Sequence, residues 1–289
     1  MSALFCFGLG YSATAFARVM REAGWSVSGT SRTAEGAAAA ASLGFDCLVF
    51  DGAQPGGRVR EALQAATHVL VSAAPGEAGD PVLRHHAADL ARAPAVQWIG
   101  YLSTIGVYGD SGGAWVDEEC PLNPGSPRAL RRVAAEQAWG EFARETGKRV
   151  EIFRLGGIYG PGRSALDDLR DGSARRIVKP GQVFNRIHVA DIAGVLHAAA
   201  LAPSKHAIYN VVDDEPAPPQ DVVAFAASLI GVAPPPEIPF AEADMTPMGR
   251  SFYAESRRVS NRRIRDDLGV SLAFPSYREG LRAVLAAGG

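Results

Sequence analysis

The chain is poor in cysteine and carries almost no net charge. Its three cysteines, Cys6, Cys47 and Cys120, are widely spaced, so the sequence predicts neither a disulfide framework nor a CxxC metal site. A formal net charge of −2 argues against nucleic acid or an anionic membrane as the main partner. No apolar run reaches the roughly 18 residues of a membrane-spanning helix, and the N-terminus lacks the features of a secretory signal. We therefore expect a cytoplasmic protein without a bound metal.

Apolar residues are abundant in the chain and occur in short, regular runs. It contains 289 residues, of which 47% are hydrophobic and 21% charged, enough for a large packed core. Short apolar runs alternate with helical patterns, which predicts right-handed crossovers and a parallel sheet covered on both faces. The fold class is therefore α/β with a doubly wound sheet. The predicted strands are 3–8, 26–31, 46–50, 68–74, 98–104 and 150–157, and the helices between them include 34–42, 57–66, 80–93 and 128–146.

In the last third of the chain, predicted strands and helices alternate less regularly. It predicts a helix over 191–201, a strand over 207–214, a helix after the Pro-rich residues 216–219, and a C-terminal helix. The basic stretch 255–265 favours an ordinary surface helix over a nucleic-acid site, because acids are interspersed along the chain. We expect a dinucleotide-binding core over 1–160, completed by 185–215, and a small substrate lobe from 163–185 and 232–289.

The segment FGLGYSA, residues 7–13, lies between the first predicted strand and the first predicted helix. It fits the pattern G-x-G-x-x-A. The glycines let the chain turn tightly and let a pyrophosphate approach the backbone at a helix N-terminus, and a small third residue allows the helix to pack on the strand. A tight turn without a ligand is the alternative. The position predicts a dinucleotide-binding loop that comprises Gly8, Gly10, Tyr11, Ser12 and Ala13.

The end of the second predicted strand indicates which dinucleotide binds. Chains that select NAD usually place an acid there to bind the ribose hydroxyls, but no acid lies between Glu22 and Glu35. Ser31 and Arg32 instead offer a hydroxyl and a fixed cation, which suit a 2′-phosphate. We therefore predict NADP(H) in preference to NAD(H), the alternative for Arg32 being an exposed loop arginine.

Several motifs in the right order carry a family resemblance. They are GLGYSA at 8–13, LSTIGVYGD at 102–110, RLGGIYGPGR at 154–163, NRIHVADIAGVLHAA at 185–199 and YNVVDDEP at 209–216. With these motifs the chain resembles the extended short-chain dehydrogenase/reductase family, which contains nucleotide-sugar epimerases and dehydratases. The resemblance runs through nearly the whole sequence and implies a Rossmann fold with a small C-terminal substrate lobe.

The resemblance also implies positions for the cofactor. Asp51 would contact the adenine, although it could equally cap the segment that follows it. Ala73 and Ala74 would line the cofactor, and the segment from Gly156 to Tyr159, which includes Ile158, would pass beside the nicotinamide.

The active-site residues implied by the resemblance are only partly present. Family members use a Ser/Thr, a Tyr and a Lys four residues later, and Thr104 matches the first of these. The stretch GSPRALRRVAAEQAW places Arg128 at the Tyr position and Arg132 at the Lys position. Arg132 can keep the cationic part of the Lys role, whereas Arg128 has no proton to exchange near neutral pH.

Two interpretations of these arginines are open. In the first, residues four apart share one helix face, so Arg128 and Arg132 both face the cleft and bind an anion or the cofactor ribose. In the second, they lie on a solvated face and Arg132 pairs with Glu136. In the first case a catalytic proton must come from Tyr108 or from a water held by Thr104. We expect His188 to serve packing.

The sequence thus favours an NADP(H)-binding oxidoreductase or epimerase-like protein with a degenerate Tyr/Lys pair. Its substrate would be a small polar molecule, with a nucleotide sugar or another anionic compound as the expected type, and a homodimer is compatible with it. The alternative is a non-catalytic NADP(H)-binding sensor or scaffold.

Overall fold

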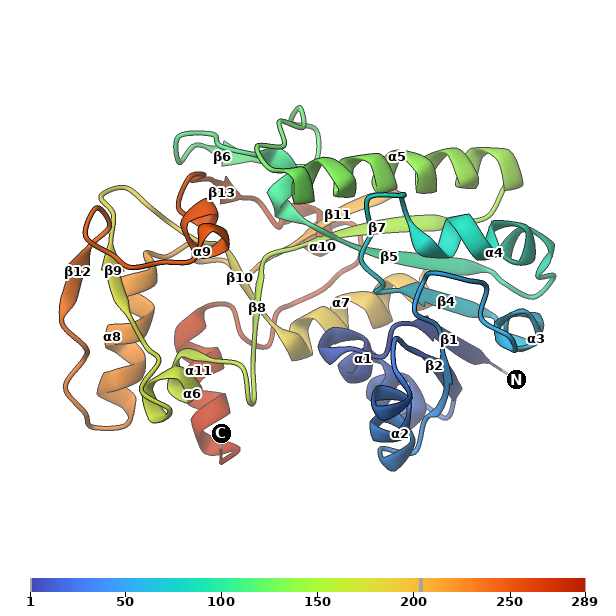
Figure 1. The fold of residues 1–289 in the computed structure, drawn as a ribbon, viewed down its shortest axis with the longest axis horizontal. Coiled ribbons are helices and arrows are strands. Elements are labelled where there is room, and N and C mark those ends of the chain that lie inside the picture. Colours follow the sequence, from blue (N-terminus) through green and yellow to red (C-terminus); the bar gives the residue numbers. More distant parts are fainter. Residues whose placement is uncertain (1, 203–204, 289) are drawn as a thin grey trace.

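A parallel seven-stranded sheet forms the centre of the protein (Figure 1). The computed structural model describes residues 2–202 and 205–288. The strand order is β11-β7-β5-β4-β1-β2-β3, and every neighbouring pair is parallel, which confirms the predicted doubly wound α/β fold. In chain order the strands are β1 (Ala3–Phe7), β2 (Ser26–Ser31), β3 (Asp46–Val49), β4 (His68–Val71), β5 (Trp98–Thr104), β7 (Val150–Leu155) and β11 (Ile208–Val211).

Helices cover both faces of this sheet. On one face α1 (Tyr11–Glu22) and α7 (Val189–Leu201) pack together over a core that includes Phe16, Ile192 and Phe153. On the other face α3, α4 and α5 bury a second core around Trp139. Their bounds are Val59–Ala65, Pro81–Arg92 and Pro127–Thr146, and α2 (Ala34–Ser42) packs beside β2 and β3. None of the helices within the described residues is long and apolar enough to cross a bilayer.

The helix termini follow from local sequence. Asp80 accepts hydrogen bonds from the N–H groups of Val82 and Leu83, and a proline takes the first position of α4. Ser126 caps α5 in the same way by accepting from the N–H of Ala129 at 3.2 Å. Helix α5 ends at Thr146, and its C-cap Gly147 has a φ of +69°, the left-handed conformation that glycine adopts without strain.

A smaller lobe lies beyond the end of the sheet (Figure 1). Its core joins Tyr159, Leu166, Val222 and Tyr277, and a second cluster surrounds Tyr253. Its elements are α6 (Ala165–Arg170), β9 (Arg176–Val178), α8 (Pro219–Leu229), β12 (Glu237–Pro239), α9 (Pro247–Phe252) and α11 (Tyr277–Ala286), with β9 and β12 paired in parallel.

Three predicted strands end two or more residues earlier than predicted. β4 ends at Val71, and the predicted strand over 150–157 is divided into β7 and a separate β8 (Gly157–Tyr159). The N–H of Gly157 donates to Asn185 instead of to the main sheet, and β8 pairs with β10 (Arg186–His188). β11 ends at Val211, because the N–H of Asp213 donates to the carbonyl of Arg186. Figure 1 shows β8 and β10 between the sheet and the smaller lobe.

The prediction of a surface helix over 255–265 was wrong. Residues Arg258–Val259 form β13, which pairs with β6 (Trp115–Val116), and only Arg262–Asp266 form a helix, α10. The physical reason is long-range pairing: the N–H groups of Arg258 and Ser260 donate to carbonyls of the β6 segment. Ile264 is buried in the core under β11, so this segment is not a free surface helix.

Candidate functional site

The N-terminus of α1, directly after the glycine loop, presents free backbone donors near the end of β1. Gly8 has a φ of +90°, and its N–H donates to the Thr30 hydroxyl at 3.0 Å. Gly10 is the N-cap of α1, so no side chain caps the helix, and its first turn holds no acid. The uncapped N–H groups and the positive end of the helix dipole together suit an anion such as a pyrophosphate.

Gly29 holds this loop close to β2, and sequence reasoning missed it. A Cβ at Gly29 would lie 2.5 Å from the carbonyl oxygen of Cys6 and 2.9 Å from Cγ of Leu9. The N–H of Leu9 also donates to the carbonyl of Thr30 at 2.7 Å. Glycine at the centre of a strand signals this kind of close backbone approach.

Ser31 and Arg32 lie where β2 ends, at the same edge of the sheet as the glycine loop. The Ser31 hydroxyl lies over the first turn of α2, since a Cβ at Gly36 would fall 2.1 Å from it. Arg32 is exposed, and no group in the described chain forms an ion pair or hydrogen bond with it. Its guanidinium is therefore free for a ligand.

The loop after β3 is held by Asp51 within it and by two histidines of α4. Asp51 accepts a hydrogen bond from the N–H of Ala53 at 2.8 Å, which is the local capping role that the sequence left open. His85 binds the carbonyl of Gly52 at 3.0 Å, and His86 accepts from the N–H of Gly56 at 3.3 Å. These two histidines of α4 thus hold the loop in place, a role that no sequence pattern indicated. Contact of Asp51 with an adenine stays a prediction.

Ala73 and Ala74 follow the end of β4 and complete the wall beside the glycine loop. A Cβ at Gly8 would lie 3.5 Å from the backbone nitrogen of Ala73, so these two segments are in van der Waals contact. Gly156 is more tightly confined, because a Cβ there would lie 3.0 Å from Cγ1 of Val212 and 3.1 Å from the carbonyl oxygen of Asn185. Gly8, by contrast, has room for a Cβ, and it is the φ of +90° that favours glycine there.

Two of the arginines of α5, Arg128 and Arg132, have different environments. Arg132 is partly buried, and its Nη1 donates to the carbonyl of Leu102 at 2.5 Å and to the Tyr101 hydroxyl at 3.2 Å. Its guanidinium also lies 5.8 Å from the centre of the Tyr101 ring. Arg128 is exposed and makes no such contact with the described residues. The Arg132–Glu136 pair of the second interpretation does not form, because Glu136 is buried and pairs with Arg154.

Thr104 ends β5 and caps the short 3-10 helix η1 (Ile105–Tyr108). Its Oγ1 accepts a hydrogen bond from the N–H of Gly106 at 3.1 Å. The side chain is half-buried, and its O–H has no acceptor among the described groups, so it can still donate to a bound molecule.

Tyr108 is buried and its hydroxyl is fully engaged. It donates to Oδ1 of Asn210 at 2.8 Å and accepts from Nη1 of Arg154 at 2.8 Å. Burial raises the pKa of Tyr108 to about 12. Such a phenol is poorly suited to exchanging protons near neutral pH.

A buried ion pair, which sequence reasoning missed, supports the end of β5 from beneath α5. Nη2 of Arg154 donates to Oε2 of Glu136 at 2.7 Å, and Nε donates to both oxygens of that carboxylate at 3.2 Å. Both residues are about 95% or more buried. Ser103 donates to the same carboxylate at 2.5 Å. The neighbour of Thr104 is thereby tied to the helix that carries Arg132.

Tyr11 joins the glycine loop to the segment after β8. Its hydroxyl donates to the carbonyl of Pro161 at 3.0 Å. Gly160 packs closely against the Tyr11 hydroxyl, because a Cβ at Gly160 would lie 2.6 Å from that oxygen and 3.4 Å from Nε2 of His188. His188 itself packs against Tyr159 and Phe274, with ring centres 5.2 Å and 4.1 Å away. Ile158 is partly buried against the core under α1.

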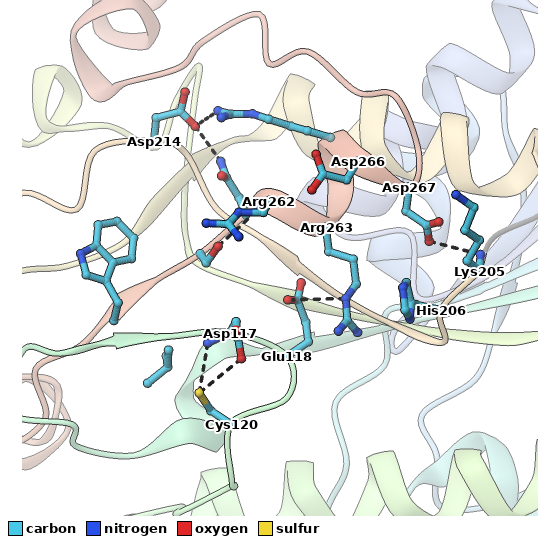
Figure 2. Close-up of a pocket in the computed structure, with 15 residues that line it drawn as sticks. Asp117, Glu118, Cys120, Lys205, His206, Asp214, Arg262, Arg263, Asp266 and Asp267 are labelled. Carbon is cyan, nitrogen blue, oxygen red and sulfur yellow. Dashed lines mark hydrogen bonds and ion pairs between the residues drawn. The ribbon is translucent and has the colours of Figure 1, made fainter.

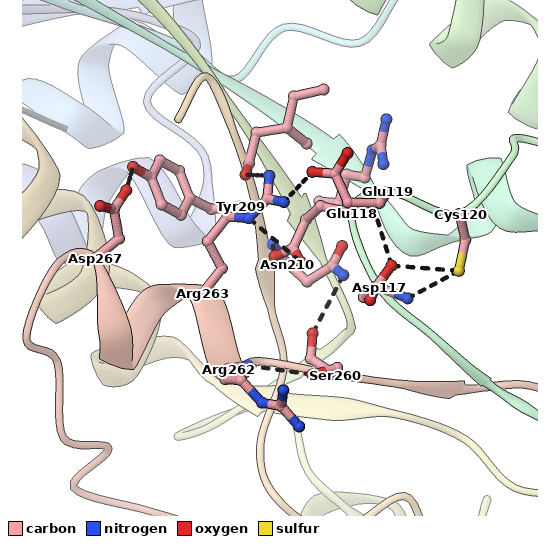
Figure 3. Close-up of polar contacts among 12 residues, drawn as sticks. Asp117, Glu118, Glu119, Cys120, Tyr209, Asn210, Ser260, Arg262, Arg263 and Asp267 are labelled. Carbon is pink, nitrogen blue, oxygen red and sulfur yellow. Dashed lines mark hydrogen bonds and ion pairs between the residues drawn. The ribbon is translucent and has the colours of Figure 1, made fainter. Parts of the chain in front are cut away.

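A separate cleft of about 840 Å³ runs along the outer edge of β11 (Figure 2). It contains none of the predicted site residues. Figure 3 shows that its charged groups serve the edge strand: Glu118 accepts from the N–H of Asn210 at 2.7 Å, and Arg263 donates to the carbonyl of Ile208 at 3.2 Å. Arg263 also lies 3.7 Å from Glu118. These side chains take the place of a further strand, which is a structural role.

Comparison with known proteins places these features in a family. The model of the NAD dependent epimerase/dehydratase family matches residues 8–212, from the glycine loop to the end of β11. Protein YeeZ of Escherichia coli K12 is 29% identical over 245 residues, which are 79% of this chain and 84% of YeeZ. The 3-diazoavenalumate denitrifying reductase of a Streptomyces species is 27% identical over 215 residues, or 68% of this chain and 67% of the reductase.

Among solved structures, a functionally unknown conserved protein from Silicibacter pomeroyi has the same architecture over its full length. It is 48% identical, superposes with a TM-score of 0.90, and the match covers 99% of both chains. The likeness therefore extends through the smaller lobe as well as the sheet.

Proposed function

Since the chain belongs to the NAD-dependent epimerase/dehydratase family, we propose that it binds NADP(H) and acts as an oxidoreductase or epimerase-like enzyme on a small polar substrate. The observation that carries this proposal is the glycine loop, with its left-handed Gly8 and an α1 N-terminus that lacks any capping side chain. Gly8, Gly10 and the first turn of α1 would hold the pyrophosphate. A bound nicotinamide supplies or accepts a hydride.

The free guanidinium of Arg32 supports NADP(H) over NAD(H). It lies beside Ser31 at the end of β2, and the described chain provides no acid to pair with it. A 2′-phosphate there would gain charge-assisted hydrogen bonds from Arg32 and a neutral one from Ser31. Without an acid at this strand end, nothing favours the two free ribose hydroxyls of NAD(H).

The residues at the end of β5 suggest how a proton would be handled. Arg132 places a permanent cation against the strand, where it can bind the ribose or an anionic group of the substrate. The free O–H of Thr104 would polarise a substrate oxygen. Because the Tyr108 hydroxyl is already engaged, the proton would come from a water held by Thr104, and Arg128 would serve as an exposed anion contact.

A non-catalytic NADP(H) sensor is the second candidate function. It is favoured by the arginine at the position where the family has its tyrosine, since Arg128 cannot exchange a proton. The two candidates differ in turnover alone. Incubation with NADPH and a panel of carbonyl compounds and nucleotide sugars, followed by cofactor absorbance, separates them, and complete absence of turnover favours the sensor.

The cofactor proposal is tested by titrating NADPH and NADH into the wild type and the Arg32→Ala variant. We expect wild type to prefer NADPH, and Arg32→Ala to lose about 1.5–3 kcal/mol of NADPH binding with little change for NADH. Arg18→Ala, which removes another exposed arginine from α1, should leave both affinities unchanged. Equal affinity of the wild type for the two cofactors would overturn the preference.

A further inference from the structure

The cleft along the outer edge of β11 is large enough to hold a small molecule (Figure 2). Its volume of about 840 Å³ lies within the range of known ligand pockets. None of the described residues that line it belongs to the glycine loop or to the end of β5. A molecule bound in this cleft would therefore lie outside the cofactor site.

Most of the charged side chains in this cleft are already engaged by the fold. Asp214 accepts a hydrogen bond from Nδ2 of Asn261 at 2.7 Å and forms an ion pair with Arg265. Glu118 and Arg263 hold the edge of β11, as described above. These groups satisfy one another and the backbone, so they are not available to a ligand.

Two opposite charges on α10 remain available. Arg262 and Asp266 are exposed and line the cleft, and neither side chain forms an ion pair or hydrogen bond with a described residue. They lie four residues apart on one helix face, where Cβ atoms are about 5–6 Å from each other. A cation that precedes an acid is the less favourable order for a helical ion pair, which agrees with the absence of a bond between them.

Trp115 adds an exposed aromatic ring to the same cleft. Its side chain is 60% exposed, which is unusual for so large an apolar group. The N–H of Ser260 donates to the carbonyl of Val116 at 2.9 Å, so the chain that leads into Arg262 runs directly beside the strand of Trp115. The indole therefore offers a stacking face close to the start of α10.

We propose that this cleft binds an aromatic amino acid, with its carboxylate on Arg262, its ammonium group on Asp266 and its ring on Trp115. A guanidinium matches the two oxygens of a carboxylate. The carboxylate and the ammonium group of an amino acid are attached to one carbon, so they can reach two side chains on neighbouring turns of a helix. A simple anion would meet the unpaired Asp266, which favours a zwitterion. This inference goes beyond the proposed function and does not depend on it.

The test titrates L-phenylalanine into the full chain by calorimetry, with and without saturating NADPH. We expect the wild type to bind it at a single site with the same affinity in both cases, since the cleft is separate from the cofactor site. 3-Phenylpropionate lacks the ammonium group and phenethylamine lacks the carboxylate. Each should bind at least about tenfold more weakly than L-phenylalanine, because each loses one charge-assisted contact.

Variants of the two charged residues locate the site. Arg262→Met and Asp266→Asn should each weaken binding of L-phenylalanine at least about tenfold. Lys205→Met is the matched control. It removes a cation that lines the same cleft but lies beyond Asp267, away from Arg262 (Figure 2), so it should leave the affinity unchanged.

Variants of Trp115 give an independent readout. Trp98 and Trp139 are fully buried, so a change of tryptophan fluorescence on binding should come from Trp115. Trp115→Phe keeps an aromatic ring and should still bind L-phenylalanine in calorimetry while the fluorescence change disappears. Trp115→Ala should weaken binding, because the stacking face is lost.

Three results would overturn the inference. They are a wild type that does not bind L-phenylalanine, folded variants at Arg262 and Asp266 that bind it as well as wild type, and equally tight binding of 3-phenylpropionate. The last result would make the cleft a site for anions only. Asp266→Asn preserves the shape of the side chain and decides the question if Arg262→Met fails to fold. Failure of the proposed function is separate, since it would appear as a lack of NADPH binding.

Discussion

At the scale of single residues, position 29 is one where the structure requires glycine. An alanine there would place its Cβ 2.5 Å from a backbone oxygen of β1, which cannot move without disturbing the sheet. We expect Gly29→Ala to lower the free energy of unfolding by about 1–3 kcal/mol and to weaken NADPH binding, because the glycine loop must shift. Denaturant unfolding and cofactor titration measure the two effects.

Gly194→Ala is the matched control for this prediction. Gly194 lies in the interior of α7 and a Cβ there would meet nothing within 4 Å. The same change should therefore raise stability by about 0.5–1 kcal/mol and leave cofactor binding unchanged. If Gly29→Ala were as well tolerated as Gly194→Ala, the close approach of the loop to β2 would not constrain the chain.

Residue type alone predicted the chemical properties of a side chain but not its hydrogen-bond partners in the fold. The sequence showed that Arg132 is a permanent cation four residues after Arg128, yet it could not show that Leu102 and Tyr101 take up one of its nitrogens. Tyr108 looked like a candidate acid because it closely follows Thr104. Its partners Arg154 and Asn210 lie 46 and 102 residues further along the chain, beyond the reach of any local pattern.

At the scale of elements, α5 depends on the buried pair of Glu136 and Arg154. Replacing one member leaves the other charged, buried and unpaired, so we expect Glu136→Met or Arg154→Met alone to cost about 3–5 kcal/mol of unfolding free energy. The double variant Glu136→Met/Arg154→Met should recover much of that loss, because no charge remains buried. Denaturant unfolding of all four proteins gives the coupling energy, and strictly additive losses would show that the pair is not a unit.

Elements with a strong local signal were predictable, and elements made by distant pairing were not. The strands over 26–31 and 98–104 and the helix over 34–42 match the structure to the residue. Local features mark some of their ends, such as Gly24 before the first strand and Thr33, the N-cap of the helix. The short strands β6 and β13 have only two residues each and exist because they pair with each other. A sequence pattern carries no information about such a partner, which is why 255–265 was predicted to be a helix.

At the scale of the whole molecule, the sheet and the smaller lobe meet at β8 and β10 (Figure 1), and several titratable groups are buried there. Asp213 is the one with the largest consequence for stability. The groups that face it are Arg186 on β10, Tyr159 on β8, and its neighbours Asp214 and Glu215. Arg186 lowers the pKa of Asp213, but burial raises it further, to about 8.

This pKa predicts a distinct dependence of stability on pH. Between about pH 4 and pH 8 the folded chain keeps a proton on Asp213 that the unfolded chain has lost, so folding becomes less favourable as pH rises through that window. The slope from this one group is at most about 1.4 kcal/mol per pH unit. Asp213→Asn has a similar shape and no such proton, so its stability relative to wild type should grow from pH 5 to pH 8 and then level off.

Comparing the two proteins at each pH removes the contributions of other groups. His188, for example, acts in the opposite direction: burial lowers its pKa to about 4, so it makes folding more favourable as pH rises from about 4 to 6.5. That contribution is common to wild type and Asp213→Asn and cancels in the difference between their unfolding free energies. A difference that stays constant from pH 5 to pH 8.5 would mean that Asp213 is ionised throughout, and that Arg186 already has its counter-ion within the chain.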